Sequence, residues 1–243
     1  MELKLDLHIH TNRSPDGRMT PDEIVARAKA AGLDGVALCD HDQVWSELPQ
    51  YPDFLLIPGT EVSTDQGHLL GLFVTQPILS RNFADAVKAI RAQGGIAVLA
   101  HPFARRYQED ALNDIPCMPD GAEVWNGRAD RKNPKANQMA SRFVRQNSLL
   151  AFAGSDAHLP QEIGNGITTV SVSEPSLAAV KEALLSATAV TGGIRGKARH
   201  VAFSQLTKRR KEHAAPLAYL KWFLFTLKCL MQDACMALWN KGG

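Results

Sequence analysis

The chain has 243 residues, which is long enough for one substantial hydrophobic core and short for two. Its hydrophobic content of 45% and charged content of 21% are ordinary for a soluble globular protein. The net charge of only +2 gives no reason to expect a nucleic-acid or membrane partner.

The cysteines are scattered and form no Cys-x-x-Cys pair; they are Cys39, Cys117, Cys229 and Cys235. The first residues lead straight into a strand pattern and show no features of a signal peptide. A reduced, cytoplasmic protein is therefore expected.

Short apolar runs bounded by Gly, Pro or Asp predict strands at residues 3–7, 35–39, 54–57, 69–74, 96–100, 122–125, 149–153 and 167–172. Helices are expected between them. A capping box at residues 20–23 with Pro21 at the first position starts one helix, and Gly32 ends it. Further helices are predicted at 82–93, 133–147 and 175–187. This alternation predicts an α/β protein with a mainly parallel sheet. It does not distinguish an open sheet from a barrel.

The pattern changes after Gly193. A basic stretch containing the run 208–211 is followed by a predicted helix, Pro216–Trp239, whose leucines recur at spacings of three and four. Lys221, Lys228 and Asp233 interrupt its apolar residues, so it is not a membrane span. Its apolar stripe predicts packing on the domain, self-association through a second subunit, or weak contact with a membrane surface. The basic run is expected to be a solvated helix face or a patch that contacts phosphate or lipid.

Histidines and carboxylates follow the predicted strands at the point where each strand ends. Functional groups of parallel α/β sheets gather at such ends because the loops there converge on one face. The histidines are His8, His10, His41, His68, His101 and His158, and the carboxylates are Asp16, Asp40, Asp42, Glu61 and Asp156.

Two of these residues, His8 and His10, are two positions apart, so both imidazoles project to the same side of an extended backbone. Asp156 and His158 repeat that spacing. Imidazole and carboxylate ligands suit zinc, manganese or iron, and six imidazoles with several carboxylates exceed the four ligands of one tetrahedral site. Two or three divalent metal ions are therefore expected.

The same residues lie in segments that resemble the polymerase and histidinol phosphatase (PHP) superfamily. The matching segments are DLHIHT at 6–11, SPDG at 14–17, CDHD at 39–42, PGTEVS at 58–63, GHLLG at 67–71, AHP at 100–102, GSDAH at 154–158 and IG at 163–164. The resemblance implies a PHP metallo-phosphoesterase domain over residues 1–193, built as a distorted (β/α)7-type barrel. A basic, amphipathic helical extension would occupy residues 194–243.

The resemblance also implies a three-metal site. His8, His10, Glu61 and Asp156 would hold one ion. Glu61 would bridge to a second ion, held also by His68 and His101, and Asp16, His41 and His158 would hold the third. All nine positions carry competent ligands, as expected for an active member.

The expected reaction is hydrolysis of a phosphate ester by a metal-bridging hydroxide held near Glu61. Glu61, Asp156 and His158 are predicted to act in catalysis. Arginine binds phosphoryl oxygens in a bidentate manner, so one or more of Arg105, Arg106, Arg13 and Arg18 is predicted to bind substrate. Asp40, Asp42 and Glu123 are candidates for orienting the imidazoles or for assisting proton transfer.

The favoured substrate is a small nucleotide or phosphorylated metabolite. Three alternatives remain open: an exonuclease acting on DNA or RNA ends, a non-catalytic, metal-stabilised interaction module, and hydrolysis of a carbon–nitrogen bond by the same metal chemistry. The exonuclease requires a basic track beside the site, to which the near-neutral total charge gives little support.

Overall fold

The computed structural model describes residues 1–106, 108, 110 and 112–239. Within them, one sheet has the strand order β7-β6-β5-β4-β3-β2-β1-β8-β9. The strands are β1 Glu2–Ile9, β2 Gly35–Leu38, β3 Leu55–Thr64, β4 Gly67–Leu72, β5 Ile96–Leu99, β6 Gly121–Asn126, β7 Leu150–Gly154, β8 Gly166–Ser171 and β9 Val190–Gly193. Each of the eight predicted strands is present. Most ends shift by one or two residues, but the strand predicted at 54–57 continues to Thr64.

The prediction of a mainly parallel sheet is wrong, because half of the neighbouring strand pairs are antiparallel. β1–β2, β2–β3, β5–β6 and β6–β7 are parallel, whereas β3–β4, β4–β5, β1–β8 and β8–β9 are antiparallel. The reason is local at β3, which continues to Thr64 and turns back directly into β4. Gly67 closes that turn with φ +115°, a conformation that suits glycine. β9 was not predicted, since it is short, exposed and half glycine.

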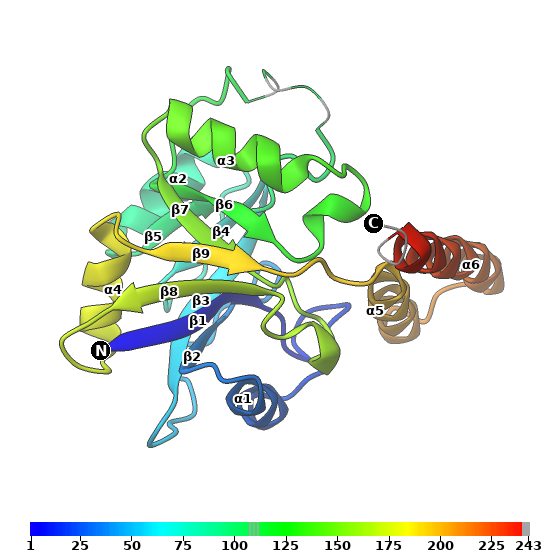
Figure 1. Cartoon of the computed structure of the whole chain (residues 1–243), viewed down its shortest axis with the longest axis horizontal. Coiled ribbons are helices and arrows are strands. Elements are labelled where there is room, and N and C mark those ends of the chain that lie inside the picture. Colours follow the sequence, from blue (N-terminus) through cyan, green and yellow to red (C-terminus); the bar gives the residue numbers. More distant parts are fainter. Residues whose placement is uncertain (107, 109, 111, 240–243) are drawn as a thin grey trace.

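The sheet curves into a nearly closed barrel, as the family resemblance implied (Figure 1). Its ends meet where β7 approaches β1 and β8. The Ala153 amide donates to Thr168 Oγ1 at 2.8 Å, and Ile9 forms an isolated parallel bridge with Ala157. Gly154 permits this approach, because a Cβ there would lie 2.4 Å from the Cβ of His8. The closure therefore brings the end of β7 against the metal-ligand candidates of β1.

Helices cover the barrel on the outside. They are α1 Pro21–Ala30, α2 Phe83–Ala92, α3 Ala136–Gln146 and α4 Leu177–Leu185, with short 3₁₀ turns η1 Ala129–Arg131 and η2 Pro160–Glu162. The predicted capping box starts α1: Thr20 Oγ1 accepts from the Glu23 amide at 3.3 Å, and the Thr20 amide donates to Glu23 Oε2 at 2.8 Å. Apolar side chains of α2 and α3 form one core cluster with β4, β5 and β6. This packing fixes the strands whose ends carry the polar residues.

A helical hairpin follows β9, as the predicted helical extension required. Its helices are α5 Ala198–Lys211 and α6 Pro216–Trp239, and they lie at one end of the molecule (Figure 1). Trp222 Nε1 donates to the Ala202 carbonyl at 2.7 Å, and Asp233 accepts from the Ala198 amide at 2.7 Å. Residues 240–243 of the predicted extension lie outside the described residues. Among the described helices, none is both long and apolar enough to cross a membrane.

Candidate metal centre

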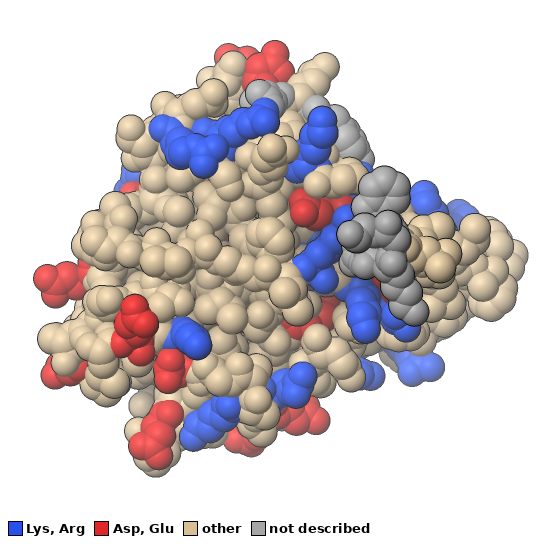
Figure 2. Space-filling view, in the orientation of Figure 1, with Lys and Arg blue, Asp and Glu red and all other residues tan. Residues whose placement is uncertain are grey.

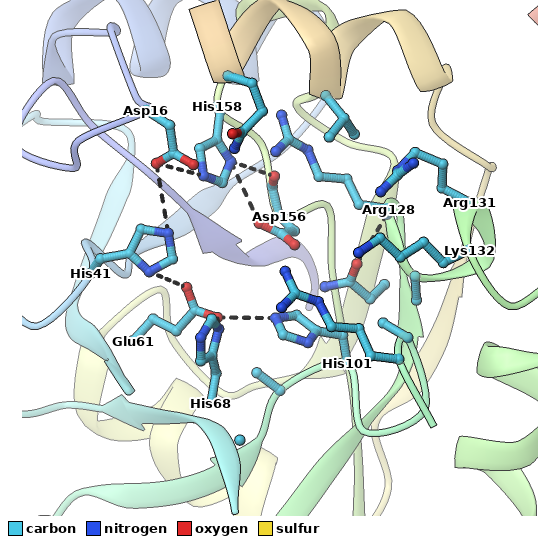
Figure 3. A pocket seen from close by; sticks show the side chains of 18 of the residues that line it. Asp16, His41, Glu61, His68, His101, Arg128, Arg131, Lys132, Asp156 and His158 are labelled. Carbon is cyan, nitrogen blue, oxygen red and sulfur yellow. Dashed lines mark hydrogen bonds and ion pairs between the residues drawn. The ribbon is translucent and has the colours of Figure 1, made fainter. Parts of the chain in front are cut away.

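Nine side chains from seven separate segments converge at the end of the barrel. Seven of them line one pocket and are labelled in Figure 3, and His8 and His10 are buried beneath it. His8, Glu61 and His68 project from strands, and the others lie in the loops that follow β1, β2, β5 and β7. The structure thus brings together the residues predicted as metal ligands: His8, His10, Asp16, His41, Glu61, His68, His101, Asp156 and His158.

The carboxylate of Glu61 lies at the centre of the cluster and is buried. Its Oε1 is 2.7 Å from His68 Nδ1 and 3.0 Å from His101 Nε2. On the other side, its Oε2 is 2.8 Å from His41 Nδ1, 3.4 Å from His10 Nε2 and 3.6 Å from His8 Nε2. One carboxylate therefore faces five imidazoles, which is the position of a bridging ligand.

Donor atoms in the rest of the cluster are spaced as ligands of a common ion. The Nε2 atoms of His8 and His10 are 3.1 Å apart, and Asp156 Oδ1 lies 3.9 and 3.5 Å from them. Two ligands about 2.0–2.1 Å from a tetrahedral zinc ion lie roughly 3.3 Å from each other. Asp16 Oδ1 is 3.2 Å from His158 Nε2 and 3.6 Å from His41 Nε2.

The division of these donors into three sets is less distinct than the resemblance implied. The set His8, His10 and Asp156 has all its donor atoms within 4.8 Å of one another, in agreement with the implied first ion. However, His41 belongs to two further groups of this kind, one with Glu61 and His68 and one with His10 and His158. The allocation of the individual residues to three ions therefore stays a prediction.

Two buried oxygens in the cluster indicate that it is built for cations. Among the residues that the structure describes, Asp16 Oδ1 and Glu61 Oε2 accept no hydrogen bond, although His158 Nε2 lies 3.2 Å from the first and His41 Nδ1 lies 2.8 Å from the second. Burial of a carboxylate oxygen is costly unless a positive charge or a hydrogen bond compensates it, and an imidazole supplies that charge only when it is protonated. A divalent ion at each oxygen supplies that compensation, so the donor set fits the metals expected for it.

The protonation states agree with this reading. Burial lowers the pKa of His10 to about 3, assisted by the neighbouring His158 and His41, so its imidazole is neutral and able to ligate. Burial also disfavours the cation at His41, but Glu61 and Asp16 outweigh it and raise the pKa of His41 to about 9. A protonated His41 places a positive charge between the carboxylates of Glu61 and Asp16. Against the effect of its burial, His41, His68 and His8 hold the pKa of Glu61 well below its usual range.

Second-layer residues orient several of the imidazoles. Glu123 Oε1 lies 2.9 Å from His8 Nδ1, and Glu123 Oε2 accepts from the His101 amide at 2.7 Å. Asp40 acts through a hydroxyl: it accepts from Ser14 Oγ at 2.6 Å, and that Oγ lies 3.0 Å from His10 Nδ1. Such partners fix the ring orientation and the tautomer of a ligating histidine.

Asp42, the third candidate for this role, points elsewhere. Its carboxylate pairs with Arg81 and accepts from the Ser63 amide at 2.8 Å. Asp42 therefore organises the turn after β2 and contacts no imidazole of the cluster among the described residues.

The backbone at two of the ligand candidates is strained. His101 has φ 31° and Asp156 has φ 56°, values that non-glycine residues rarely adopt. Strain of this kind persists where the surrounding structure holds a side chain in a functional position.

A lysine at the end of α5 connects the hairpin to a loop of this site. Lys211 Nζ donates to the carbonyls of Asn12, Ser14 and Gly17 at 2.7, 2.8 and 2.7 Å. All three carbonyls belong to the loop that carries Asp16, so one ammonium group fixes the loop of a metal-ligand candidate. This contact could not be foreseen from the basic run in which Lys211 lies.

Basic side chains line the pocket together with the metal-ligand candidates. The cavity has a volume of about 260 Å³, and its lining includes Arg105, Arg106, Arg128, Arg131 and Lys132. Figure 3 labels the last three, which lie beside Asp156 and His101. The first two were predicted as substrate-binding residues, and the other three were not. The sequence does contain a signal for these three. Arg128, Arg131 and Lys132 closely follow the end of β6, and the histidines were predicted as ligands because they also follow strand ends.

The basic residues differ in what holds them. Arg128 forms a bidentate pair with Glu162, at 2.7 and 2.5 Å. Arg106 donates to the backbone carbonyls of Pro102 and Gln66, so it ties two loops together. Arg105 is exposed. Burial lowers the pKa of Lys132, and the nearby charge of Arg105 lowers it further. Arg105 and Lys132 are therefore the cations best placed to meet a bound anion.

The structure does not bring the other two predicted arginines to the pocket wall. The Arg13 guanidinium lies 3.5 Å from the centroid of the Trp45 ring and donates to the Val44 carbonyl at 3.2 Å. Arg18 is exposed and is absent from the described lining. Both flank Asp16 in sequence, but neither is among the described residues that line the cavity.

Comparisons with known proteins agree with the arrangement of the site. A model of the PHP domain matches residues 6–100, and a model described as PHP-associated matches residues 134–189. An uncharacterized protein of Methanocaldococcus jannaschii is 30% identical over 142 residues, which are 51% of this chain and 82% of that protein. The 5′-3′ exoribonuclease Rnm of Escherichia coli is 29% identical over 156 residues, 58% of this chain and 52% of that enzyme.

One solved structure shares the fold over most of the chain. It is a two-domain protein of Bacteroides vulgatus described as containing a predicted PHP-like metal-dependent phosphoesterase. The two structures superpose with a TM-score of 0.62 at 23% identity, over 85% of this chain and 70% of that one.

Proposed function

The chain belongs to the PHP family, and from that membership we propose that it is a metal-dependent phosphoesterase acting through its cluster of histidines and carboxylates. The observation that carries the proposal is a pair of buried oxygens, Asp16 Oδ1 and Glu61 Oε2, that accept no hydrogen bond from the described residues and lie among nine donor side chains. The fit is best for two or three ions of zinc, manganese or iron.

When bound, such ions supply hydroxide at neutral pH and neutralise charge on phosphoryl oxygens. The chain's own residues then have distinct tasks. Glu61, Asp156 and His158 line the pocket and position the attacking water. Arg105 and Lys132 line the same pocket and bind the remaining negative charge of the substrate. Glu123 keeps the His8 ring in its ligating orientation.

The size of the pocket supports a small phosphate ester, such as a nucleotide or a phosphorylated metabolite. Pockets for small molecules usually measure about 300–1,000 Å³, and this one, at about 260 Å³, is at the lower limit. It accommodates one phosphoryl group and a small part of the group that leaves.

The test combines metal analysis of the purified protein with a phosphate-release screen over nucleotides, sugar phosphates and oligonucleotides. His10→Ala removes a fully buried ligand candidate and is expected to abolish release while much of the fold remains. Equal turnover by the wild type and this variant, or a protein that takes up no metal at saturating concentration, would refute the proposal.

A second candidate is removal of nucleotides from the 5′ end of RNA, the activity named for the Escherichia coli relative. The distribution of charge along the chain favours RNA binding more than the net charge of the whole chain does. Residues 194–243 carry ten Lys or Arg and two Asp or Glu, whereas residues 1–193 carry 17 Lys or Arg and 23 Asp or Glu. The hairpin formed by the basic part lies at the pocket, which Val201 and Gln205 of α5 help to line.

The two candidates differ in how their rate depends on substrate length and salt. An exoribonuclease prefers 5′-phosphorylated oligonucleotides to mononucleotides and loses affinity steeply as salt rises, because it releases counterions from several phosphates. A phosphatase of small esters shows neither dependence. Comparing a mononucleotide with a short 5′-phosphorylated RNA at two salt concentrations separates them.

A further inference from the structure

The outer face of α6 is apolar and uncovered. Nine of its large apolar side chains are between 38% and 71% exposed: Leu217, Leu220, Phe223, Leu224, Leu227, Leu230, Met231, Met236 and Leu238. In the rest of the described chain, large exposed apolar residues are scattered singly. The largest apolar patch on the surface of a typical monomer is often functional, so a series of exposed large apolar side chains along one helix indicates an interaction surface.

The helix is apolar on two sides, and only one of them is used. Toward α5 it buries Cys229 and donates from Trp222 Nε1 to the Ala202 carbonyl, and Asp233 binds Arg199 at 2.8 Å. At 100° per residue, Leu220, Leu224, Leu227 and Met231 fall on the opposite side. The side that faces α5 is covered by that helix. The opposite side has no such cover from the described residues, so its apolar side chains need another apolar environment.

Positive charge borders the uncovered face. Lys221 and Lys228 lie two helical turns apart, and both are exposed. Each comes directly after a leucine of the uncovered face. The hairpin, Ala198 to Trp239, has seven Lys or Arg against two Asp or Glu, and both acids already lie near a cation of the hairpin, Asp233 at Arg199 and Glu212 at Lys208. In Figure 2 the outer end of the hairpin is an uncharged lobe with Lys and Arg atoms along its margins.

We infer that the outer face of α6 is a docking surface for a membrane that contains anionic lipid. A helix with leucine and aromatic residues on one side and lysines at the boundary lies in the lipid interface, with its apolar side chains among the acyl chains and its cations at the headgroups. Stable attachment of this kind takes apolar area and basic charge together, and α6 offers both. The helix lies on the membrane surface and does not span the bilayer, in agreement with the finding that none of the described helices is both long and apolar enough to cross a membrane.

Two other occupants fit the observations less well. A second copy of the hairpin would bring two strongly basic segments together without added acidic residues, which opposes association. A nucleic acid would match the charge, but it is bound through aromatic platforms and cations, whereas this face consists mainly of leucine and methionine. Anionic lipid is complementary to both the charge and the apolar area.

The inference is tested with the full chain by flotation on vesicles of phosphatidylcholine with or without roughly 30 mol% phosphatidylglycerol. The wild type is expected to float with the anionic vesicles and much less with phosphatidylcholine alone. Leu220→Ser/Leu227→Ser is expected to weaken binding about tenfold or more, since it removes apolar contact. Leu79→Ser, at a leucine that is 88% exposed elsewhere on the molecule, is the matched control and should change nothing.

A second variant checks the contribution of charge. Lys221→Glu/Lys228→Glu keeps every leucine and is expected to weaken binding to the anionic vesicles about tenfold or more at low salt. Circular dichroism and phosphate release, which neither variant should alter, show that each is folded. The proposal is overturned if the wild type does not float, if the leucine variant floats equally well, or if light scattering without vesicles shows a dimer that the leucine variant loses.

Discussion

The metal centre and the α5–α6 hairpin treat charge and burial in opposite ways. In the metal centre, ionisable side chains from distant parts of the sequence are buried together, and each carboxylate is compensated by neighbouring imidazoles. In the hairpin, a contiguous segment exposes its apolar side chains and keeps its charges at the margins. The first arrangement favours the binding of cations, and the second favours an apolar surface that carries negative charge. In each region, the expected partner follows from the groups that the protein itself does not satisfy.

The comparison is tested most strongly at Glu61, whose carboxylate faces five imidazoles. Glu61→Gln keeps the shape and removes the charge, so we expect bound metal to fall and kcat/KM for phosphate release to drop by about 10³-fold or more. Elemental analysis and the release assay measure the two effects. Asp42→Asn is the control, because the Asp42 carboxylate pairs with Arg81, and it should leave bound metal and kcat/KM unchanged. A similar loss in that variant would show that the effect is not specific to the cluster.

A smaller effect is expected one layer further out. Glu123→Gln weakens the partner of His8 Nδ1 without touching a ligating nitrogen. Loss of such outer partners usually costs 10–100-fold in metal affinity or activity, and we expect a loss of about that size. Competition with a chelator measures the affinity. Wild-type affinity in this variant would mean that the packing of the barrel alone holds the imidazole.

The lysine at the end of α5 makes the two regions less separate than their charges suggest. Lys211→Met removes three hydrogen bonds to the loop of Asp16, so we expect the weakest-bound metal ion to dissociate about tenfold more readily. Lys211→Arg should restore part of the affinity. Arg210→Met is the matched control on the neighbouring exposed residue. If both methionine variants lose affinity equally, the basic character of the helix end matters and the three hydrogen bonds do not.

The smallest effect is expected on the uncovered face of the hairpin. Leu224→Ala removes a side chain that is mostly exposed, so the free energy of unfolding should change by no more than about 0.5 kcal/mol. Leu5→Ala, in the fully buried core, should cost about 2–5 kcal/mol. Urea denaturation compares them. A cost above about 1 kcal/mol at Leu224 would indicate that this face is buried in the isolated protein.

Much of the fold follows from local sequence, because buried strands and capped helices need particular residues in consecutive positions. Thr20 and Glu23 specify the start of α1 on their own. Strand direction does not have such a local signature: the return of β3 into β4 depends on a turn closed by Gly67, and β9 has no apolar run at all.

The same distinction applies to the site. The nine ligand candidates could be predicted because they lie in short, recognisable segments at strand ends. Arg13 and Arg18 were selected by proximity to Asp16 in sequence, which does not determine where a long side chain points. Lys211 could not be predicted, since its partners are almost 200 positions away. Periodicity found the apolar stripe of α6 but could not tell whether that stripe is covered.

The position of β1 in the barrel has a consequence for how the protein handles its ions. β1 lies between β2 and β8, and His8 and His10 sit where its backbone also bridges to Ala157. The chelating groups are thus held by main-chain pairing that does not depend on an ion being present. We expect ions to exchange on an intact scaffold, so that the apoprotein stays folded and can be reloaded with a different metal without passing through an unfolded chain.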